Sequence, residues 1–207
     1  MIKKRTREKL NRLLQERNEY PERAADVDAR IDEVFGDTLA VMVMDMSGFC
    51  RQTVRYGINH FLAKIHRLHS IAVPVVEQHG GEVIKVEADN VYSVFPDVPQ
   101  AVAAAADTAG RLEAANSMLP EELDMRAEFG IGYGRVLIVE DEDFYGTEVN
   151  LASKLGEDIA HGGEILLTAA ACKRMTAEGA GGCEPVEMTV SGLNFTAYRF
   201  KRPNAAG

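Results

Sequence analysis

Long apolar runs are absent from this chain of 207 residues. No stretch approaches the roughly 18 uncharged residues that a membrane-spanning helix needs, and no apolar segment follows the basic start, as a signal peptide would require. Cysteine is scarce as well: Cys50, Cys172 and Cys183 are scattered and odd in number, which is typical of reduced thiols rather than a disulfide framework. We therefore expect a soluble, cytoplasmic protein with no membrane span.

Basic residues are concentrated at the N-terminus. Residues 1–18 hold seven Lys or Arg and two Glu, a net charge of +5, which leaves −14 for the rest because the whole chain carries −9. A body this acidic argues against a nucleic-acid partner. The basic start has no interleaved aromatic side chains, so a solvated helix face is favoured over contact with RNA or a membrane surface.

Apolar residues at helical spacing indicate two N-terminal helices separated by Pro21. The two groups are Leu10, Leu13 and Leu14, and then Val27, Ile31, Val34 and Phe35. Gly36 and Asp37 end this segment. Since the remaining chain is long enough to bury a core of its own, we expect a helical lead over residues 1–36 and one domain over residues 37–203.

The pattern beyond residue 37 alternates strands with amphipathic helices. Strands are predicted at 39–45, 82–87, 91–95 and 125–132, and helices at 58–79, with Ile58 and Leu62 on the apolar face, and at 99–118. This β-α-β-β-α-β order is the split βαβ arrangement of ferredoxin-like sheets. A helix at 147–157, a strand at 164–168 and a hairpin near 186–200 follow. The predicted class is α+β, a ferredoxin-like βαββαβ sheet with additional C-terminal strands and helices.

Two carboxylates fall at the ends of apolar strands. Asp45 closes the first strand, and Asp89 lies in the short turn between the second and third. Two such acids from neighbouring strands can share divalent cations, which suits phosphoryl or nucleotidyl transfer. The simpler alternatives are a strand-end cap for Asp45 and a turn residue for Asp89.

Four segments, in the same order, resemble the successive motifs of class III adenylate and guanylate cyclases. They are Val43–Phe49, Gly80–Asp89, Phe129–Val136 and Asp143–Leu155, within a resemblance that covers about residues 38–201. The resemblance implies that Asp45 and Asp89 hold two Mg²⁺ or Mn²⁺ ions, which would activate the ribose 3′-hydroxyl and neutralise the triphosphate. It also implies that the backbone amides from Met46 through Gly48 and Phe49 wrap the phosphates.

Lys85 and Asp143 match the pair that reads the purine in adenylate cyclases. An ammonium can donate to a ring nitrogen of adenine while a carboxylate accepts from its exocyclic amine, and guanine presents the reverse polarity at that edge. The resemblance therefore favours ATP over GTP. The simpler alternatives are a snorkelling strand residue for Lys85 and, for Asp143, membership of the acidic turn at 140–143.

Asn150 and Lys154 lie four residues apart and so share one face of a helix. The resemblance assigns Asn150 to the ribose and places Lys154 where the family typically has arginine, whose planar fork holds two phosphate oxygens. Ser191 stands where many relatives have lysine, and Ala88 where glycine is common. These departures predict a weak adenylate cyclase that makes 3′,5′-cyclic AMP and pyrophosphate. The alternative is a catalytically silent module that binds nucleotide or a partner domain.

The resemblance also implies a head-to-tail homodimer. Lys85 and Asp89 lie on one hairpin, and a single nucleotide cannot easily place both its base and its metal-bound phosphates there. Two chains related by a twofold axis would solve this geometry and form two equivalent sites. The N-terminal helices would then be the route from an upstream sensor.

Three other interpretations have weak support. His66 and His69 share a helix face, but no further ligand stands at zinc-binding spacing. The glycines at 130–134 are not followed directly by a helix and fail the dinucleotide fingerprint. A diguanylate cyclase would carry its paired glycines at the hairpin turn, whereas Gly80 and Gly81 precede the strand by its full length.

Overall fold

The computed structural model describes residues 5–47, 56–120, 123–140, 142–177, 182–190 and 193–201. Two helices, α1 (Arg7–Glu19) and α2 (Ala24–Phe35), come first. The remaining elements are β1 (Gly36–Met46), α4 (Ile58–Gln78), β2 (Glu82–Glu87), β3 (Asn90–Phe95), α5 (Val98–Asn116), β4 (Ala127–Val139), β5 (Asp143–Tyr145), α6 (Thr147–Ser153), the π-helical segment η3 (Lys154–Ile159), β6 (Ile165–Leu167), α7 (Ala169–Ala177), β7 (Cys183–Val190) and β8 (Leu193–Phe200).

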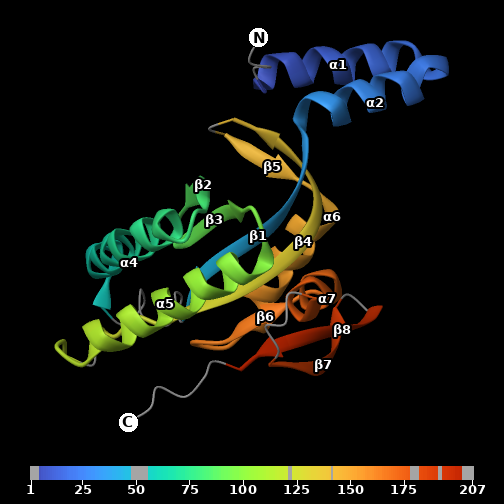
Figure 1. Ribbon diagram of the computed structural model, residues 1–207. Coiled ribbons are helices and arrows are strands. Elements are labelled where there is room, and N and C mark those ends of the chain that lie inside the picture. The colour runs from blue at the N-terminus through green and yellow to red at the C-terminus, as the bar shows by residue number, and fades with distance from the viewer. Residues whose placement is uncertain are drawn as a thin grey trace.

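The strands form one sheet in the order β2-β3-β1-β4-β6-β8-β7, with β5 paired to β4 (Figure 1). The first four of these strands pair with one another in antiparallel fashion, as in a ferredoxin-like sheet. Strand β6 joins β4 in parallel, and the β7–β8 hairpin continues the sheet. The predicted α+β fold class is therefore confirmed.

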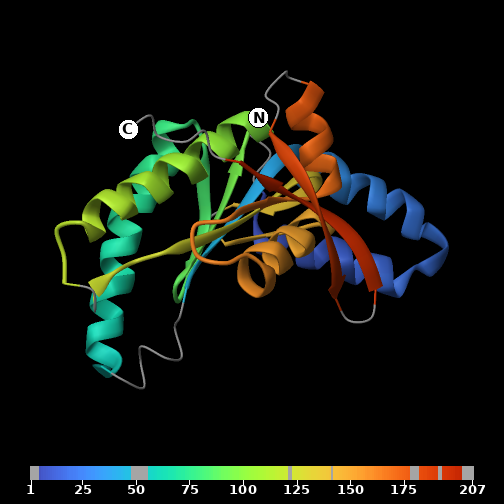
Figure 2. The same cartoon turned by 90° about the horizontal axis from the view of Figure 1, so that it is seen from below.

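Both faces of the sheet are covered, which explains why β1 is almost continuously apolar. Met42, Met44 and Met46 face the core formed with α4, α5 and α7, and Val41 and Val43 face the opposite core with α6. Figure 2 shows α4 and α5, coloured teal and green, together on one side of the strands. Met42 and Met44 are buried in this core, and Met46 is the last residue of β1 and is buried as well.

The two N-terminal helices form on either side of Pro21, as predicted. They pack against each other and against the end of β4, in a small core that consists of Leu10, Leu13, Val27, Ile31, Phe35 and Val139. Because α2 leads directly into β1 at Gly36, this helical pair lies at one end of the sheet (Figure 1). Within the described residues, no helix combines the length and the apolar character of a membrane span.

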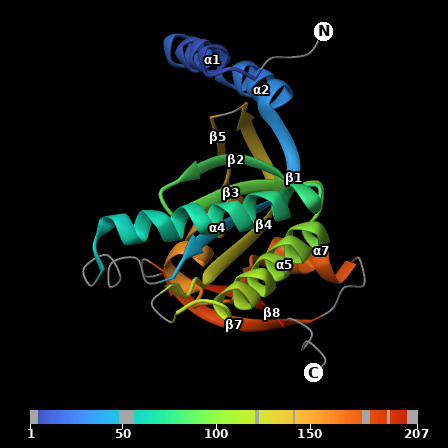
Figure 3. The same ribbon diagram turned by 90° about the vertical axis from the view of Figure 1, so that its left-hand side faces the viewer.

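Two predicted features of α4 and β4 were wrong in detail. Ile58 and Leu62 are 54% and 53% exposed, and in Figure 3 the first turns of α4 extend past the edge of the strands. Strand β4 does not end at residue 132 but continues to Val139 and returns as β5, which the sequence pattern did not reveal. Helix α7 was also missed.

The glycines of β4 allow a helix to approach the strand closely. A Cβ at Gly130 would lie 1.9 Å from the carbonyl oxygen of Ala152, and one at Gly132 would lie 2.7 Å from that of Glu148. Glycine at these positions therefore serves the packing of α6 on the sheet. This close approach fixes the helix that carries Asn150 beside β1 and β4.

Candidate active site

Asp89 lies in a two-residue turn between β2 and β3, since Glu87 and Asn90 form the last pair of the hairpin. Its side chain is buried, and burial raises the pKa of the carboxyl. The preceding residue, Ala88, has a φ of 52°, in the left-handed region where glycine is favoured. Alanine at this position thus introduces local strain beside Asp89.

Asp45 lies near the end of β1, opposite Glu128 of β4. Burial raises the pKa of Asp45 to about 7, and the charge of Asp89 contributes to the same effect, while a hydrogen bond from the Met46 amide opposes it. Strands β1 and β3 are paired up to Met44 and Val91, so the chain segments that carry Asp45 and Asp89 lie side by side. The charges of Glu128 and Glu157 act on Asp45 in the same direction.

Two crowded carboxylates offer hard oxygen ligands of the kind that Mg²⁺ and Mn²⁺ prefer. Within the described ranges, no group of three or more His, Cys, Asp or Glu side chains is arranged to hold a metal ion. The donor set at Asp45 and Asp89 fits a magnesium site in which phosphate oxygens and water supply the remaining ligands. Among the described residues, His66 and His69 belong to no such group either.

The backbone amides expected to wrap phosphates are partly used within the protein. The Met46 N–H donates to the Asp45 carboxylate, and the Ser47 N–H donates to the carbonyl oxygen of Arg126 at 2.9 Å. These two amides therefore already have acceptors. Gly48 and Phe49 lie outside the described residues, so their contact with phosphate stays a prediction.

A β-bulge in β2 sets the direction of Lys85. The register shifts between Val83 and Lys85, so that Ile84 is the extra residue. Strict alternation would place Lys85 on the same face as Val83, toward α4, but the bulge turns it to the face that holds Ile84. There its ammonium lies 4.7 Å from the centre of the Tyr92 ring.

Lys85 and Asp143 come together as an ion pair, with Nζ and Oδ1 3.2 Å apart. Burial opposes the charge on Lys85, but the hydrogen bond and charge of Asp143 raise its pKa overall. Burial likewise opposes the charge of Asp143, while the Phe144 amide and Lys85 lower its pKa overall. Both groups are therefore charged at neutral pH, as base recognition by this pair would require.

Asn150 and Lys154 lie on the side of α6 and η3 that faces away from the sheet. Asn150 is exposed, and Lys154 forms an ion pair with Asp158 one turn further on. The π-helical segment begins at Lys154, a local geometry that is often found at functional sites. Both side chains are therefore accessible at the surface, and their roles toward a nucleotide stay predictions. Ser191 lies outside the described residues.

Tyr92 and Glu157 are residues of this region that the sequence reasoning missed. The Tyr92 hydroxyl donates to Glu157 Oε1 at 2.9 Å, and its ring packs edge-on against Phe144 at a centroid distance of 6.2 Å. Tyr92 therefore connects the Lys85–Asp143 pair with η3. The position of Tyr92 in an apolar strand is the one sequence signal that its side chain points into the protein. Its contact with Glu157 could not be predicted, because it depends on how η3 packs against β3.

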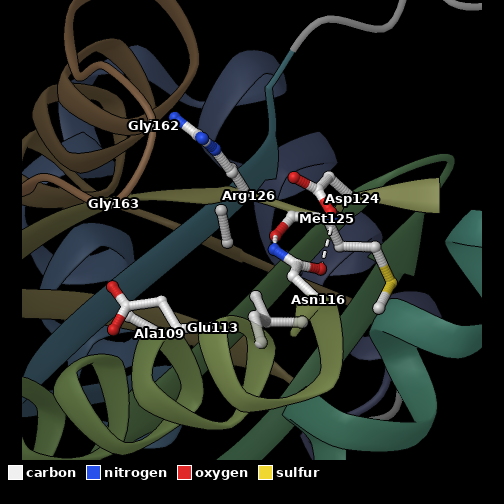
Figure 4. Close-up of a pocket in the computed structure, with 10 residues that line it drawn as sticks. Ala109, Glu113, Asn116, Asp124, Met125, Arg126, Gly162 and Gly163 are labelled. Atoms are coloured by element: carbon white, nitrogen blue, oxygen red, sulfur yellow. Dashed lines mark hydrogen bonds between the residues drawn. The ribbon is translucent and has the colours of Figure 1, made fainter. Parts of the chain in front are cut away.

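A separate cavity of about 370 Å³ lies between the end of α5 and the start of β4 (Figure 4). Arg126, Glu113 and Asn116 line it, and the Asn116 side chain is held by both backbone groups of Met125. None of the residues that the sequence singles out lines this cavity. The candidate active site is instead the surface that carries Asp45, Asp89, Lys85 and Asp143.

No protein-family model matches the chain. A curated protein of Rhizobium meliloti (strain 1021), named "Putative adenylate cyclase 3", is 30% identical over 129 residues, which are 62% of this chain and 22% of that protein. The chain thus spans about a fifth of the length of this curated relative.

Solved cyclase structures share the fold. The adenylyl cyclase CyaB from P. aeruginosa aligns with a TM-score of 0.68 and 19% identity, over 82% of this chain and 96% of that one. The catalytic core of a rhodopsin-guanylyl cyclase with converted specificity, in complex with ATPαS, aligns with a TM-score of 0.67 and 19% identity, over 80% and 98%. The chain therefore has the fold of adenylyl and guanylyl cyclase catalytic domains, and the resemblance indicated by its sequence motifs is confirmed.

Proposed function

We propose that this chain is an adenylate cyclase, which converts ATP to 3′,5′-cyclic AMP and pyrophosphate. The observation that carries the proposal is the ion pair between Lys85 and Asp143. It joins two strands at the positions that the resemblance assigns to purine recognition. The pair presents a donor beside an acceptor, which complements the ring nitrogen and exocyclic amine of adenine and opposes the polarity of guanine.

Asp45 and Asp89 would hold two Mg²⁺ or Mn²⁺ ions. When bound, such ions neutralise the triphosphate and make the ribose 3′-hydroxyl easier to deprotonate. The chain's own contribution is to hold the two carboxylates together, one at the end of β1 and one in the β2–β3 turn. Burial of both carboxyls and the charge of Asp89 beside Asp45 make the ionised pair costly without a cation, which favours cation binding.

The active site would be shared between two chains of a head-to-tail homodimer. Asn150, which would orient the ribose, and Lys154, which would stabilise charge on the α-phosphate, face away from the sheet that carries Asp45. A second chain would bring its own Asn150 and Lys154 against the metal acids of the first. Each dimer would then have two equivalent sites.

A nearly silent, nucleotide-binding module is the second candidate function. The observation in its favour is the state of Lys154, whose ammonium pairs with Asp158. An ammonium also lacks the planar fork of the arginine that relatives carry here. Loss of one well-placed donor typically lowers the rate on the order of 100- to 1000-fold, so we expect low activity.

The test is to incubate the purified protein with ATP or GTP and Mn²⁺ or Mg²⁺ and to identify products by mass spectrometry. We expect cyclic AMP and pyrophosphate, more with Mn²⁺ than with Mg²⁺, and no product from Asp45→Asn. Tight ATP binding without product would favour the silent module. Product formation by Asp45→Asn at the parent rate would contradict the metal assignment.

A further inference from the structure

The N-terminal helix α1 contacts the proposed purine-reading residue directly. We infer that Arg7 is a positioning residue for Asp143, so that the N-terminal helices control how well the site recognises adenine. This inference rests on the proposed function, because it assumes that Asp143 reads the base. It gives the helical lead a defined role in that site.

Arg7 contacts three residues of the β4–β5 hairpin, Glu142, Asp143 and Tyr145. Its Nε donates to Glu142 Oε2 at 2.7 Å, its Nη1 donates to the Tyr145 hydroxyl at 2.5 Å, and its Nη2 lies 3.9 Å from Asp143 Oδ2. The guanidinium thus spans the hairpin residues on both sides of Phe144. A planar group with five donors can hold such a set of acceptors in one fixed arrangement.

The two oxygens of Asp143 have different partners. Oδ1 lies 3.2 Å from Lys85 Nζ and accepts the Phe144 amide at 3.0 Å. Oδ2 faces Arg7, and the Tyr145 hydroxyl also donates to this carboxylate. Because Arg7 donates to the Tyr145 oxygen, it leaves the hydroxyl proton of Tyr145 directed to Asp143. Arg7 therefore fixes the oxygen of Asp143 that Lys85 does not hold.

Further contacts fasten the helical lead to the same hairpin. The Glu140 amide donates to the Arg5 carbonyl at 3.1 Å, and Arg5 pairs with Asp37 at 2.6 Å. Arg135 of β4 holds both carboxylate oxygens of Asp32 in α2, at 2.7 and 2.8 Å. Together with the apolar core shared by α1, α2 and β4, these contacts tie the helices to the hairpin and to the strands beside it. Figure 1 shows both at the same end of the sheet.

The location of Arg7 predicts an effect on base recognition rather than on metal binding. Asp143 pairs with Val139 near one end of β4, whereas Asp45 pairs with Glu128 near the other end. A displacement of α1 would therefore move Asp143 relative to Lys85 and leave the Asp45 end of the sheet in place. The measurable consequence is a change in affinity for ATP relative to GTP.

The test compares Arg7→Gln with Arg12→Gln, a matched change on the same helix at a residue that pairs with Glu8 and is 71% exposed. Equilibrium dissociation constants of the full chain would be measured with Mn²⁺ and non-hydrolysable analogues of ATP and GTP. Because single exposed ion pairs contribute little, we expect Arg7→Gln to weaken binding of the ATP analogue about two- to fivefold. Binding of the GTP analogue and the melting temperature should change little, Arg12→Gln should behave as the parent, and Arg7→Lys should lie between.

Measurements on the Asp143→Asn variant distinguish a failure of this inference about Arg7 from a failure of the proposed function. If Arg7 acts through Asp143, Arg7→Gln should have no further effect on nucleotide affinity in that background. A normal ATP-to-GTP affinity ratio in Arg7→Gln, with Asp143→Asn impaired, would overturn this inference alone. If Arg7→Gln lowers the melting temperature but leaves the ratio of ATP to GTP affinity unchanged, the role of Arg7 is structural only, and the inference is overturned as well. Unchanged affinity in Asp143→Asn, or no nucleotide binding by the parent, would overturn the proposed function and this inference with it.

Discussion

The ammonium of Lys85 and the carboxylate of Asp143 lie 3.2 Å apart, although their strands occupy different parts of the sheet. The bulge at Ile84 turns Lys85 to this face, and the β4–β5 hairpin brings Asp143 back over it. Tyr92 packs beneath the lysine and supports the pair. A base that enters here would meet two oppositely charged groups whose positions are set before it binds.

Replacing Lys85 and Asp143 together by alanine should lower the preference for ATP over GTP. We expect the ratio of kcat/KM values to fall about 10- to 100-fold, because the donor and the acceptor that distinguish the two bases are both removed. Glu87→Gln is a matched control, since Glu87 contacts Lys85 at 3.4 Å but is largely exposed. A double variant that discriminates as well as the parent would show that the base is read elsewhere.

Replacing Ala88 by glycine should stabilise the protein. The positive φ of Ala88 is costly for any residue with a Cβ, and its relief should outweigh the greater freedom of glycine in the unfolded chain by about 0.5–1 kcal/mol. Urea denaturation measures the difference. Ala103→Gly, at an exposed position inside α5, should instead destabilise by a similar amount. Destabilisation by Ala88→Gly would contradict the strained turn.

The raised pKa of Asp45 predicts how stability depends on pH in the absence of divalent cations. Its folded pKa of about 7, caused mainly by burial and secondarily by Asp89, lies above the unfolded value of 3.8. The contribution of this group to stability is therefore complete below about pH 4 and is lost as the pH rises through 7.

With a chelator present, Asp45→Asn should consequently be more stable than the parent at pH 8. Partial solvent screening limits the gain to the order of 1 kcal/mol, and the two proteins should converge toward pH 4. Addition of Mn²⁺ at pH 8 should stabilise the parent but not the variant. Parallel stability curves for the two proteins across this range would rule out the pKa assignment.

Replacing Lys154 by arginine should raise turnover if the site is an active but impaired cyclase. The guanidinium can hold two oxygens of the α-phosphate where the ammonium holds one, so we expect kcat to rise about tenfold or more with little change in KM. Lys173→Arg, an exposed change on α7, is the control and should have no effect. Unchanged turnover in Lys154→Arg would show that this position does not limit the rate.

Much of the fold followed from the sequence because the strand and helix signals were local. The apolar run before Asp45, the hairpin spacing around Asp89 and the helical periodicities all depend on neighbouring residues. The four cyclase-like segments then indicated Lys85 and Asp143 as partners, and the structure brings them into contact.

Other features depended on tertiary contacts that no local pattern contains. The bulge at Ile84 turns Lys85 toward Tyr92, and Asp143 reaches Lys85 from a different part of the sheet. The glycine at position 130 looks like a strand breaker until Ala152 approaches it. The contacts of Arg7 with the β4–β5 hairpin depend on where the N-terminal helices pack, and its exposed charge looked like part of a solvated helix face.

Mixing two inactive variants tests most directly whether this chain is a cyclase with a shared site. Asp45→Ala removes a metal acid and Asn150→Ala removes the ribose contact, so we expect neither homodimer to form cyclic AMP. A mixed dimer keeps one unmutated site, and random pairing of equal amounts should restore about a quarter of the parent's rate of cyclic AMP formation. If mixed dimers are shown to form and still produce no cyclic AMP from ATP under conditions where the parent does, the shared site is contradicted.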